Sequence, residues 1–163
     1  MTLITRTVET PIGELALVAS EAGLRAVHWP GREPEGGAVP GASAVLDAAA
    51  AQLREYFAGE RTDFDLPLDL VGTDFQVDAW RALAEIPDGA TVSYAEQASR
   101  LGRPAAVRAV GAANGRNPLP IVLPCHRVVG SDGSLTGFGG GLGVKRALLD
   151  HETGALALFE PAG

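Results

Sequence analysis

The first part of the chain alternates between short apolar segments and turn-forming residues, a pattern that predicts a small antiparallel sheet. Three segments have the length and residue types of strands, at 3–8, 12–19 and 24–29. Turn-forming residues separate them, at 10–13 and 21–23. We therefore expect three strands joined as a meander, then a glycine- and proline-rich surface loop over 31–41. Residues 64–70 fit either a further strand or an extended linker.

Apolar residues next recur at helical spacing. A helix is expected over 43–57, ending before Gly59, and a last helix over 142–152, ended by Gly154. Between them, the capping box Thr73-Asp74-Phe75-Gln76 predicts a helix start. The pattern as a whole predicts an α+β protein, with a small sheet and one helix in residues 1–71 and mainly helices in residues 72–163.

Two short helices in the second half predict a helix-turn-helix. The first begins at another capping box, Ser93-Tyr94-Ala95-Glu96, and stops at Leu101-Gly102. Pro104 is expected in the first turn of the second helix, which runs to about Asn114 and stops at Gly115.

The second of these helices has small side chains after one long one. Arg108 is followed by Ala109, Val110, Gly111 and Ala112. Small side chains let a backbone approach another surface closely, which suits either tight packing in a core or entry into a DNA groove. Helices that read the major groove carry several long polar side chains, so a DNA-binding role here favours the narrow minor groove, with Arg108 reaching furthest.

The charge is unevenly distributed. The net charge is −7, yet residues 100–127 contain five arginines and no acidic residue, at Arg100, Arg103, Arg108, Arg116 and Arg127. Such a segment is either a local footprint for nucleic acid or a solvated helix face. No signal peptide and no apolar stretch of membrane-spanning length is evident, and a single unpaired cysteine suits a reducing compartment such as the cytoplasm.

That cysteine, Cys125, is the candidate nucleophile. It lies between Pro124 and His126, after an apolar run, in surroundings unlike those of an ordinary core cysteine. Because side chains adjacent in sequence point apart on regular elements, His126 could activate the thiol only at an irregular turn or through a water molecule. A third group would hold the imidazole. Glu152, in the last turn of a helix where a carboxylate is slightly disfavoured, is either that group or a solvated helix end.

At this point the residues resemble a known family. Pro-Cys-His-Arg-Val at 124–128, Arg-Ala-Val-Gly at 108–111 and Asn-Pro at 117–118 closely resemble the O6-alkylguanine-DNA alkyltransferases, with matching intervals from Cys125 to Glu152 and from Tyr94 to Arg108. The stretch 139–145 resembles the family's active-site loop and following helix. The resemblance is dense over about 73–152 and looser over 1–70, where 10–13 looks like bacterial members.

The resemblance implies a ribonuclease-H-like first domain in a supporting role and a second domain that binds DNA and transfers the alkyl group. Cys125 would take the alkyl group from O6 of a guanine irreversibly, so that each protein molecule acts once. His126 would draw the thiol proton through a water, held by Glu152. Tyr94 would donate a hydrogen bond to the extruded base, and Asn117 would brace the turn between the recognition helix and the reactive strand.

The resemblance also implies how DNA is held. Arg108 would replace the flipped nucleotide in the stack, with further contacts from Tyr94, Ala109, Gly111, Ala112 and Arg116. The base pocket would be lined by Val122, Leu123, Pro124, Phe138, Gly139 and Gly140. Some relatives have serine where this chain has Gly139, which leaves the backbone donor but alters the loop's stiffness. The resemblance implies double-stranded DNA containing O6-alkylguanine as the partner and O4-alkylthymine as a further substrate, and we expect a monomer without an obligate protein partner.

Three alternatives remain beside this interpretation. One is a lesion-binding relative in which tryptophan replaces the cysteine, although this chain keeps Cys125. Another is a Cys-His-Glu hydrolase, which leaves the arginine segment without a purpose. The third is a plain helix-turn-helix regulator, which a recognition helix of alanine and glycine serves poorly. Some relatives bind zinc; with one cysteine and with His28 and His151 isolated, we expect no metal and no cofactor.

Overall fold

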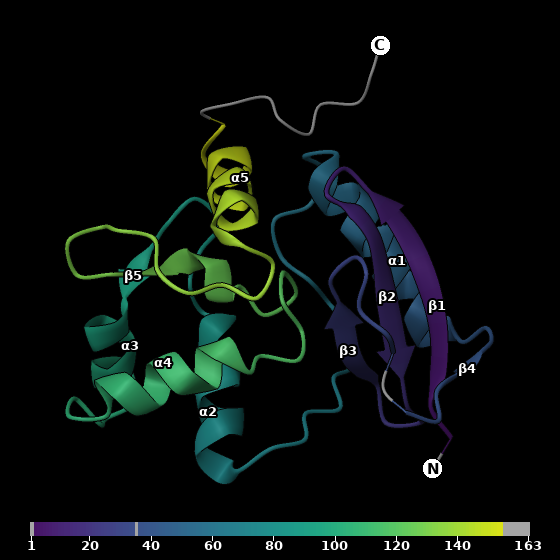
Figure 1. Ribbon diagram of the computed structural model, residues 1–163, viewed down its shortest axis with the longest axis horizontal. Helices are drawn as coiled ribbons and strands as arrows, with labels where there is room; N and C mark the ends of the chain where they lie inside the picture. Colours follow the sequence, from purple (N-terminus) through teal and green to yellow (C-terminus); the bar gives the residue numbers. More distant parts are fainter. Residues whose placement is uncertain (1, 35, 155–163) are drawn as a thin grey trace. The chain divides into compact units, whose positions relative to one another are not determined.

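The computed structural model describes residues 2–34 and 36–154. The chain forms two compact units, which divide between Val71 and Gly72 (Figure 1). The α+β class is confirmed: the first unit is built on a sheet, and the second is mainly helical.

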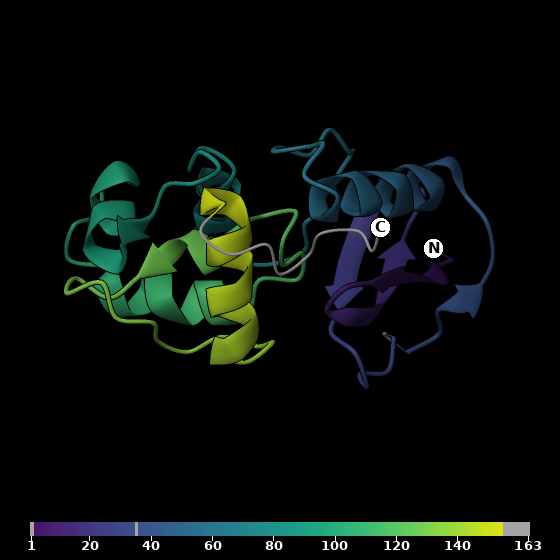
Figure 2. The ribbon, with the colours of Figure 1, turned by 90° about the horizontal axis from the view of Figure 1, so that it is seen from above.

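The first unit is a four-stranded sheet with one helix. Its order is β3-β2-β1-β4, in which β1 (Ile4–Thr10), β2 (Gly13–Ala19) and β3 (Leu24–His28) form the expected antiparallel meander. Helix α1 (Ala44–Phe57) contacts β1, β2 and β3 and lies along one face of the sheet (Figure 2). The core between them is apolar and includes fully buried Leu15, Leu17, Leu46 and Leu53, and Ser43 caps the helix.

Two short pairings in this unit were not evident from sequence. The loop expected over 31–41 ends in a two-residue strand, β4 (Val39–Pro40), which pairs in parallel with β1. Residues 64–70 are extended rather than a strand, with one isolated bridge between Leu68 and Leu24. Gly23 makes this approach possible, since a Cβ there would lie 2.6 Å from the Pro67 carbonyl oxygen.

The second unit contains the remaining helices. They are α2 (Asp74–Leu83), α3 (Tyr94–Arg100), α4 (Val107–Gly115) and α5 (Leu142–Thr153). Both expected capping boxes are present, at Thr73 and at Ser93. Helices α3 and α4 form the helix-turn-helix, and α2 packs against both. Between α3 and α4, Gly102 takes a positive φ of 73° that ends α3.

One helix boundary was wrong. Pro104 is not in the first turn of α4; it lies in the preceding turn, and α4 begins at Val107. The N-cap residue is Ala106, which makes no side-chain capping bond. A proline suits a first helical turn, but no capping side chain here fixes the start near it.

A short parallel pair positions the functional part of this unit. Strand β5 (Val92–Ser93) pairs with β6 (Val128–Val129), with Val92 opposite Val128 and Ser93 opposite Val129. Tyr94 directly follows β5, and the turn containing Cys125 directly precedes β6. Because the pair is parallel, Tyr94 lies beside the segment that follows β6, and the cysteine turn lies at the other end of β6, beside the residues that precede β5.

Candidate functional site

Cys125 lies in a turn of 3₁₀ helix, Cys125–Arg127, where the resemblance implied a reactive strand. Pro124 precedes the turn with φ −79° and ψ 68°, and the Arg127 amide donates to the Pro124 carbonyl at 3.0 Å. Proline cannot donate a backbone hydrogen bond, which explains why a ladder does not extend through this segment. Cys125 therefore lies in an irregular turn, which is one of the two conditions under which His126 could activate its thiol.

Asn117 fastens the loop that leads to this turn. Its Oδ1 accepts a hydrogen bond from the Leu119 amide at 2.9 Å, and its Nδ2 donates to the Leu123 carbonyl at 2.8 Å. Between these two anchors Ile121 has a φ of 75°, a left-handed conformation that costs a branched residue about 1–2 kcal/mol. The loop is thus held from both sides of its strained residue, and the predicted lining residues Val122, Leu123 and Pro124 are buried within it.

The structure brings together His126 of the 3₁₀ turn and Glu152 of α5, which are 26 residues apart in the sequence. The His126 Nε2 lies 2.6 Å from Glu152 Oε2, and the two side chains are 0% and 1% exposed. Burial lowers the pKa of His126 and the Glu152 carboxylate opposes that effect. Its other nitrogen, Nδ1, is buried without a hydrogen-bond partner among the described residues. With Nε2 donating to the carboxylate, the neutral ring keeps a lone pair on Nδ1, where it can accept a proton.

Arg127 is not part of the basic surface to which its sequence position assigned it. It is 5% exposed, and its Nε and one terminal nitrogen donate to the two oxygens of Glu152 at 2.8 and 3.0 Å. The other terminal nitrogen donates to the Ile86 carbonyl at 2.6 Å. Burial acts to raise the pKa of Glu152, but the hydrogen bonds from His126 and Arg127 lower it to about 2. Glu152 is therefore a buried anion and not a solvated helix end.

Lys145 is a functional candidate that the sequence interpretation missed. It is the only lysine of the chain and is 1% exposed. Its ammonium donates to the carbonyls of Val128 at 2.7 Å and Thr136 at 3.1 Å, and lies 5.9 Å from the ring centres of Tyr94 and Phe138. The sequence did contain a signal. Every other lysine or arginine position of the chain is an arginine, so the single lysine at 145 is exceptional.

Lys145 also acts on the thiol. Burial raises the pKa of Cys125, while the Asn117 amide and the Lys145 charge act to lower it. The cysteine itself is 7% exposed. A desolvated thiol with a cation and an amide donor nearby is protonated at rest, and these groups favour the thiolate once a base removes the proton.

Tyr94 and the loop after β6 form the more open side of the site. Tyr94 and Phe138 are half-buried, Gly140 is half-buried and Gly139 is exposed. The Tyr94 hydroxyl accepts a hydrogen bond from the Thr136 hydroxyl at 3.1 Å, which leaves its own proton free to be donated elsewhere. Thr136 was not among the predicted residues. It joins the site through this hydrogen bond and through its carbonyl, which accepts from Lys145.

The predicted DNA-contacting residues of α4 lie on its surface. Arg108, Ala109 and Ala112 are exposed, Gly111 is half-buried, and Arg116 follows the helix and is exposed. The opposite side of α4 is fixed by polar bonds: the Trp80 indole donates to the Ala113 carbonyl at 2.7 Å, and Gln97 and Asn114 exchange side-chain hydrogen bonds at 2.8 and 3.2 Å. A helix held on one side thus presents small residues and exposed arginines outward.

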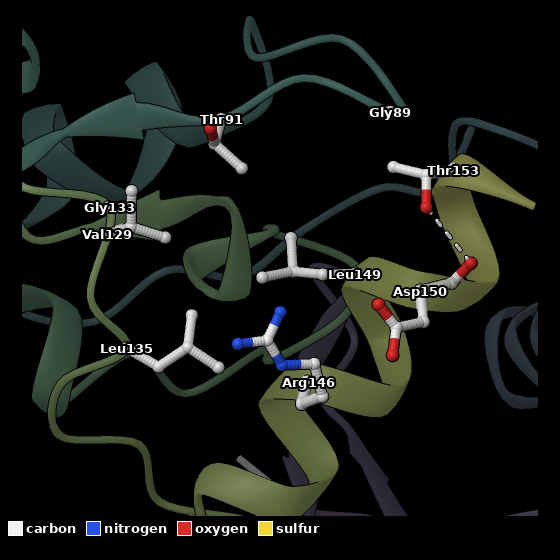
Figure 3. A pocket seen from close by; sticks show the side chains of 9 residues that line it. All are labelled: Gly89, Thr91, Val129, Gly133, Leu135, Arg146, Leu149, Asp150 and Thr153. Atoms are coloured by element: carbon white, nitrogen blue, oxygen red, sulfur yellow. Dashed lines mark hydrogen bonds between the residues drawn. The ribbon is translucent and has the colours of Figure 1, made fainter. Parts of the chain in front are cut away.

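A cavity of about 220 Å³ lies elsewhere in the second unit, between α5 and the loop after β6 (Figure 3). Arg146, Leu149 and Asp150 of α5 face Val129 and Leu135 across it. None of its lining residues is among the predicted site residues. In the described part of the chain, no group of three or more His, Cys, Asp or Glu side chains is placed to hold a metal ion, and no helix has the length and apolar character needed to cross a membrane.

The comparisons with known proteins agree along the chain. Residues 3–70 match the family model for the "6-O-methylguanine DNA methyltransferase, ribonuclease-like domain", and residues 74–154 the model for its "DNA binding domain". A methylated-DNA–protein-cysteine methyltransferase of Mycobacterium bovis is 48% identical over 159 residues, 90% of each chain. The one from Methanosarcina barkeri is 45% identical over 89% of this chain and 94% of the relative.

A solved structure agrees as well. The crystal structure of Mycobacterium tuberculosis OGT in complex with DNA superposes with a TM-score of 0.86 at 46% identity, covering 96% of this chain and 99% of that one. Both domain models and relatives at this identity point to one conclusion. The chain belongs to the 6-O-methylguanine DNA methyltransferase family.

Proposed function

We propose that this protein repairs DNA directly, by moving an alkyl group from O6 of guanine to its own Cys125. The observation that carries the proposal is the 3₁₀ turn, which holds the chain's single cysteine next to a histidine whose Nε2 is bound to a buried glutamate. This is the arrangement of a nucleophile, a base and an orienting group. The family membership supplies the substrate class.

The reaction is a displacement at the alkyl carbon. The thiol proton passes through a water molecule to Nδ1 of His126, the sulfur–carbon bond forms and the carbon–oxygen bond to guanine breaks. The departing guanine takes up one proton, so that the proton lost by the thiol is balanced. Tyr94 donates a hydrogen bond to the leaving base, which stabilises the negative charge that develops there. The thioether product has no route back to a thiol, so each molecule reacts once.

The damaged base must leave the helical stack to reach Cys125. We place Arg108 in the space that the base vacates, with Ala109, Gly111 and Ala112 allowing α4 to lie close in the minor groove and Arg116 contacting the backbone. The exposure of Arg108, Ala109, Ala112 and Arg116, on or directly after a helix whose other side is held by hydrogen bonds, supports this assignment. The base would enter on the side of Tyr94, Phe138, Gly139 and Gly140, and Val122, Leu123 and Pro124 would form the inner wall.

Several finer points belong to the same proposal. We assign the first unit a supporting role and the second unit the binding and transfer of the alkyl group. O4-alkylthymine is expected as a second substrate. We also expect a monomer in the cytoplasm, because an unpaired thiol that must remain reduced suits that compartment.

A mass measurement tests the central step. The protein is incubated with a duplex carrying O6-methylguanine, and the peptide containing Cys125 is weighed. The expected result is a gain of one methyl group in place of the thiol hydrogen, limited to one equivalent per protein. Unmodified Cys125 would contradict the proposal, and continued turnover would point to a hydrolase instead.

Two variants separate chemistry from binding. Cys125→Ser should abolish transfer and leave DNA binding in place. Arg108→Ala should slow repair of duplex DNA more than transfer from a free modified base, which needs no extrusion. If both substrates slow equally, Arg108 does not take the place of the base.

A further inference from the structure

Arg127 follows the reactive pair Cys125 and His126 in the sequence, and its side chain is buried. Its guanidinium is buried against Glu152, which is 25 residues away in sequence, and makes two parallel hydrogen bonds to that carboxylate. Such bidentate pairs fix the plane and the position of a carboxylate. The carbonyl of Ile86 and the carboxylate of Asp88, at 2.6 and 3.4 Å, hold the other side of the guanidinium.

We propose that Arg127 is a positioning residue for alkyl transfer, which holds Glu152 in place as an anion so that the proton from Cys125 rests on His126. The inference rests on the proposed function. Its basis is the sharing of Glu152 Oε2, which receives both the Arg127 nitrogen and the His126 Nε2. Rotation of the carboxylate would break the bonds to both partners. The imidazole is therefore oriented by a carboxylate that is itself oriented.

The charge of Arg127 has a second consequence. With a guanidinium on both oxygens, Glu152 is a weak base, and the low pKa of its carboxyl agrees with this. Proton transfer from the imidazolium to Glu152 is then unfavourable, so Glu152 orients the ring and does not accept the proton. Arg127 also acts directly to lower the pKa of His126, by repulsion of the imidazolium. The ring therefore remains neutral, and able to accept a proton, to a lower pH.

The charged and titratable groups around His126 come from several segments of the second unit. They are Cys125 and Arg127 from the 3₁₀ turn, Glu152 and Lys145 from α5, and Asp88 from the loop before β5. Burial and the neighbouring Glu152 raise the pKa of Asp88, while Arg127 lowers it. Among these groups, Arg127 contacts both Glu152 and Asp88. Replacing Arg127 therefore changes the electrostatic potential at the His126 imidazole more than replacing Asp88 would.

The test compares Arg127→Met, which removes charge and hydrogen bonds, with Arg127→Lys, which keeps the charge and loses the fork. The rate of single-turnover methyl transfer is measured against pH for both. In Arg127→Met, the acid limb of the profile should move up by about one pH unit. At pH values below the acid limbs of both proteins, the variant should then react roughly tenfold more slowly than the unaltered protein. In Arg127→Lys, the acid limb should stay near that of the unaltered protein while the rate falls at all pH values. A purely structural role would lower the active fraction and leave both limbs in place.

A second measurement does not depend on DNA. The titration of the His126 imidazole is followed by nitrogen NMR, with the signals of His28 and His151 identified by substitution to glutamine. The midpoint should rise in Arg127→Met and stay nearly unchanged in Arg127→Lys. Arg61→Met is the matched control: Arg61 also pairs through Nε with a glutamate, Glu55, at 2.9 Å, but in the first unit and partly exposed. It should change neither the imidazole titration nor the transfer rate.

The outcomes separate the two claims. If the unaltered protein takes up no methyl group, the proposed function is wrong, and the imidazole titration still reports on Arg127. If the unaltered protein reacts and Arg127→Met keeps both its acid limb and its imidazole midpoint, the positioning role is wrong. Tryptophan fluorescence of each variant identifies loss of folding, and Arg127→Lys, which keeps the charge in the core, remains as a test should Arg127→Met not fold.

Discussion

The two units of this protein treat their charged side chains in opposite ways. The first unit buries an apolar core of strands and one helix. Two of its ion pairs, Arg6–Asp47 and Arg61–Glu55, have side chains that are 26–64% exposed, and a third, Arg25–Asp69, is partly buried with 24% and 18% exposed. The second unit buries Arg127, Lys145, His126 and Glu152. Exposed pairs contribute little to stability, whereas each buried charge depends on its partner. The second unit therefore carries buried charges that are costly if a partner is lost, and these charges surround the candidate reactive cysteine.

The largest expected effect comes from breaking one pair in each unit. Glu152→Ala leaves Arg127 buried and without its carboxylate, and we expect a loss of about 3–5 kcal/mol in the free energy of unfolding. Glu55→Ala removes the same type of pair at the surface and should cost about 0–1 kcal/mol. Urea unfolding followed by circular dichroism measures both. Equal losses would mean that the buried network is no more demanding than the exposed pairs.

Acid should act on the second unit through the same glutamate. The pKa of Glu152 falls from 4.5 to about 2 on folding, so the unfolded chain binds more protons in this window. The stabilisation is therefore complete above pH 4.5 and is lost as the pH falls toward 2, by about 3 kcal/mol. Fluorescence of Trp80, buried in the second unit, reports the change in a Trp29→Phe background. Glu152→Gln should remove this part of the pH dependence, and a slope that persists in Glu152→Gln assigns it to other groups.

Removal of the buried lysine should affect the thiol. Lys145→Met takes away a positive charge that lowers the pKa of Cys125, so that pKa should rise, and alkylation by iodoacetamide near pH 8 should slow by about tenfold per unit of rise. The adjacent Arg146→Met is the control, since it removes the same charge from an exposed neighbouring position. A thiol titration that Lys145→Met leaves unchanged would show that the ammonium serves only to bind the two carbonyls.

The smallest effect is expected at the exposed edge of the site. Thr136→Val removes the hydrogen bond to the Tyr94 hydroxyl and should slow methyl transfer by about 2–10-fold, the value of one ordinary hydrogen bond. Thr136→Ser should restore most of the rate. Reaction of Cys125 with iodoacetamide, which has no guanine to release, should be the same in all three proteins. A matching loss in that reaction would mean that the valine disturbs the thiol and not Tyr94.

Local patterns predicted most of the fold. The meander, α1 and both capping boxes depend on residues close in sequence, and the structure contains them where the pattern indicated. The two-residue strands β4, β5 and β6 are too short to carry a pattern and depend on distant partners. The predicted start of α4 was wrong, because a proline is compatible with a first helical turn but does not cap the helix and so does not fix where it begins.

The site shows the same limit. The surroundings of Cys125 identified it and His126, Glu152 was one of two interpretations of a carboxylate at a helix end, and the resemblance favoured its use in the site. The burial of Arg127 could not be read from its surroundings, because its partner lies 25 residues away and its neighbours in the sequence include four other arginines of a basic segment. Charge counted along the chain does not separate a cation that faces DNA from one that neutralises a carboxylate in the core.

Because the only lysine is buried, its chemical reactivity reports local opening of the second unit. Reagents that acylate lysine find no such side chain on the folded surface, because Lys145 is 1% exposed. Acylation must wait until α5 separates from the carbonyls of Val128 and Thr136. The rate at which Lys145 itself is acylated, separated from the N-terminal amine by peptide mapping, therefore reports how often the neighbourhood of Cys125 opens.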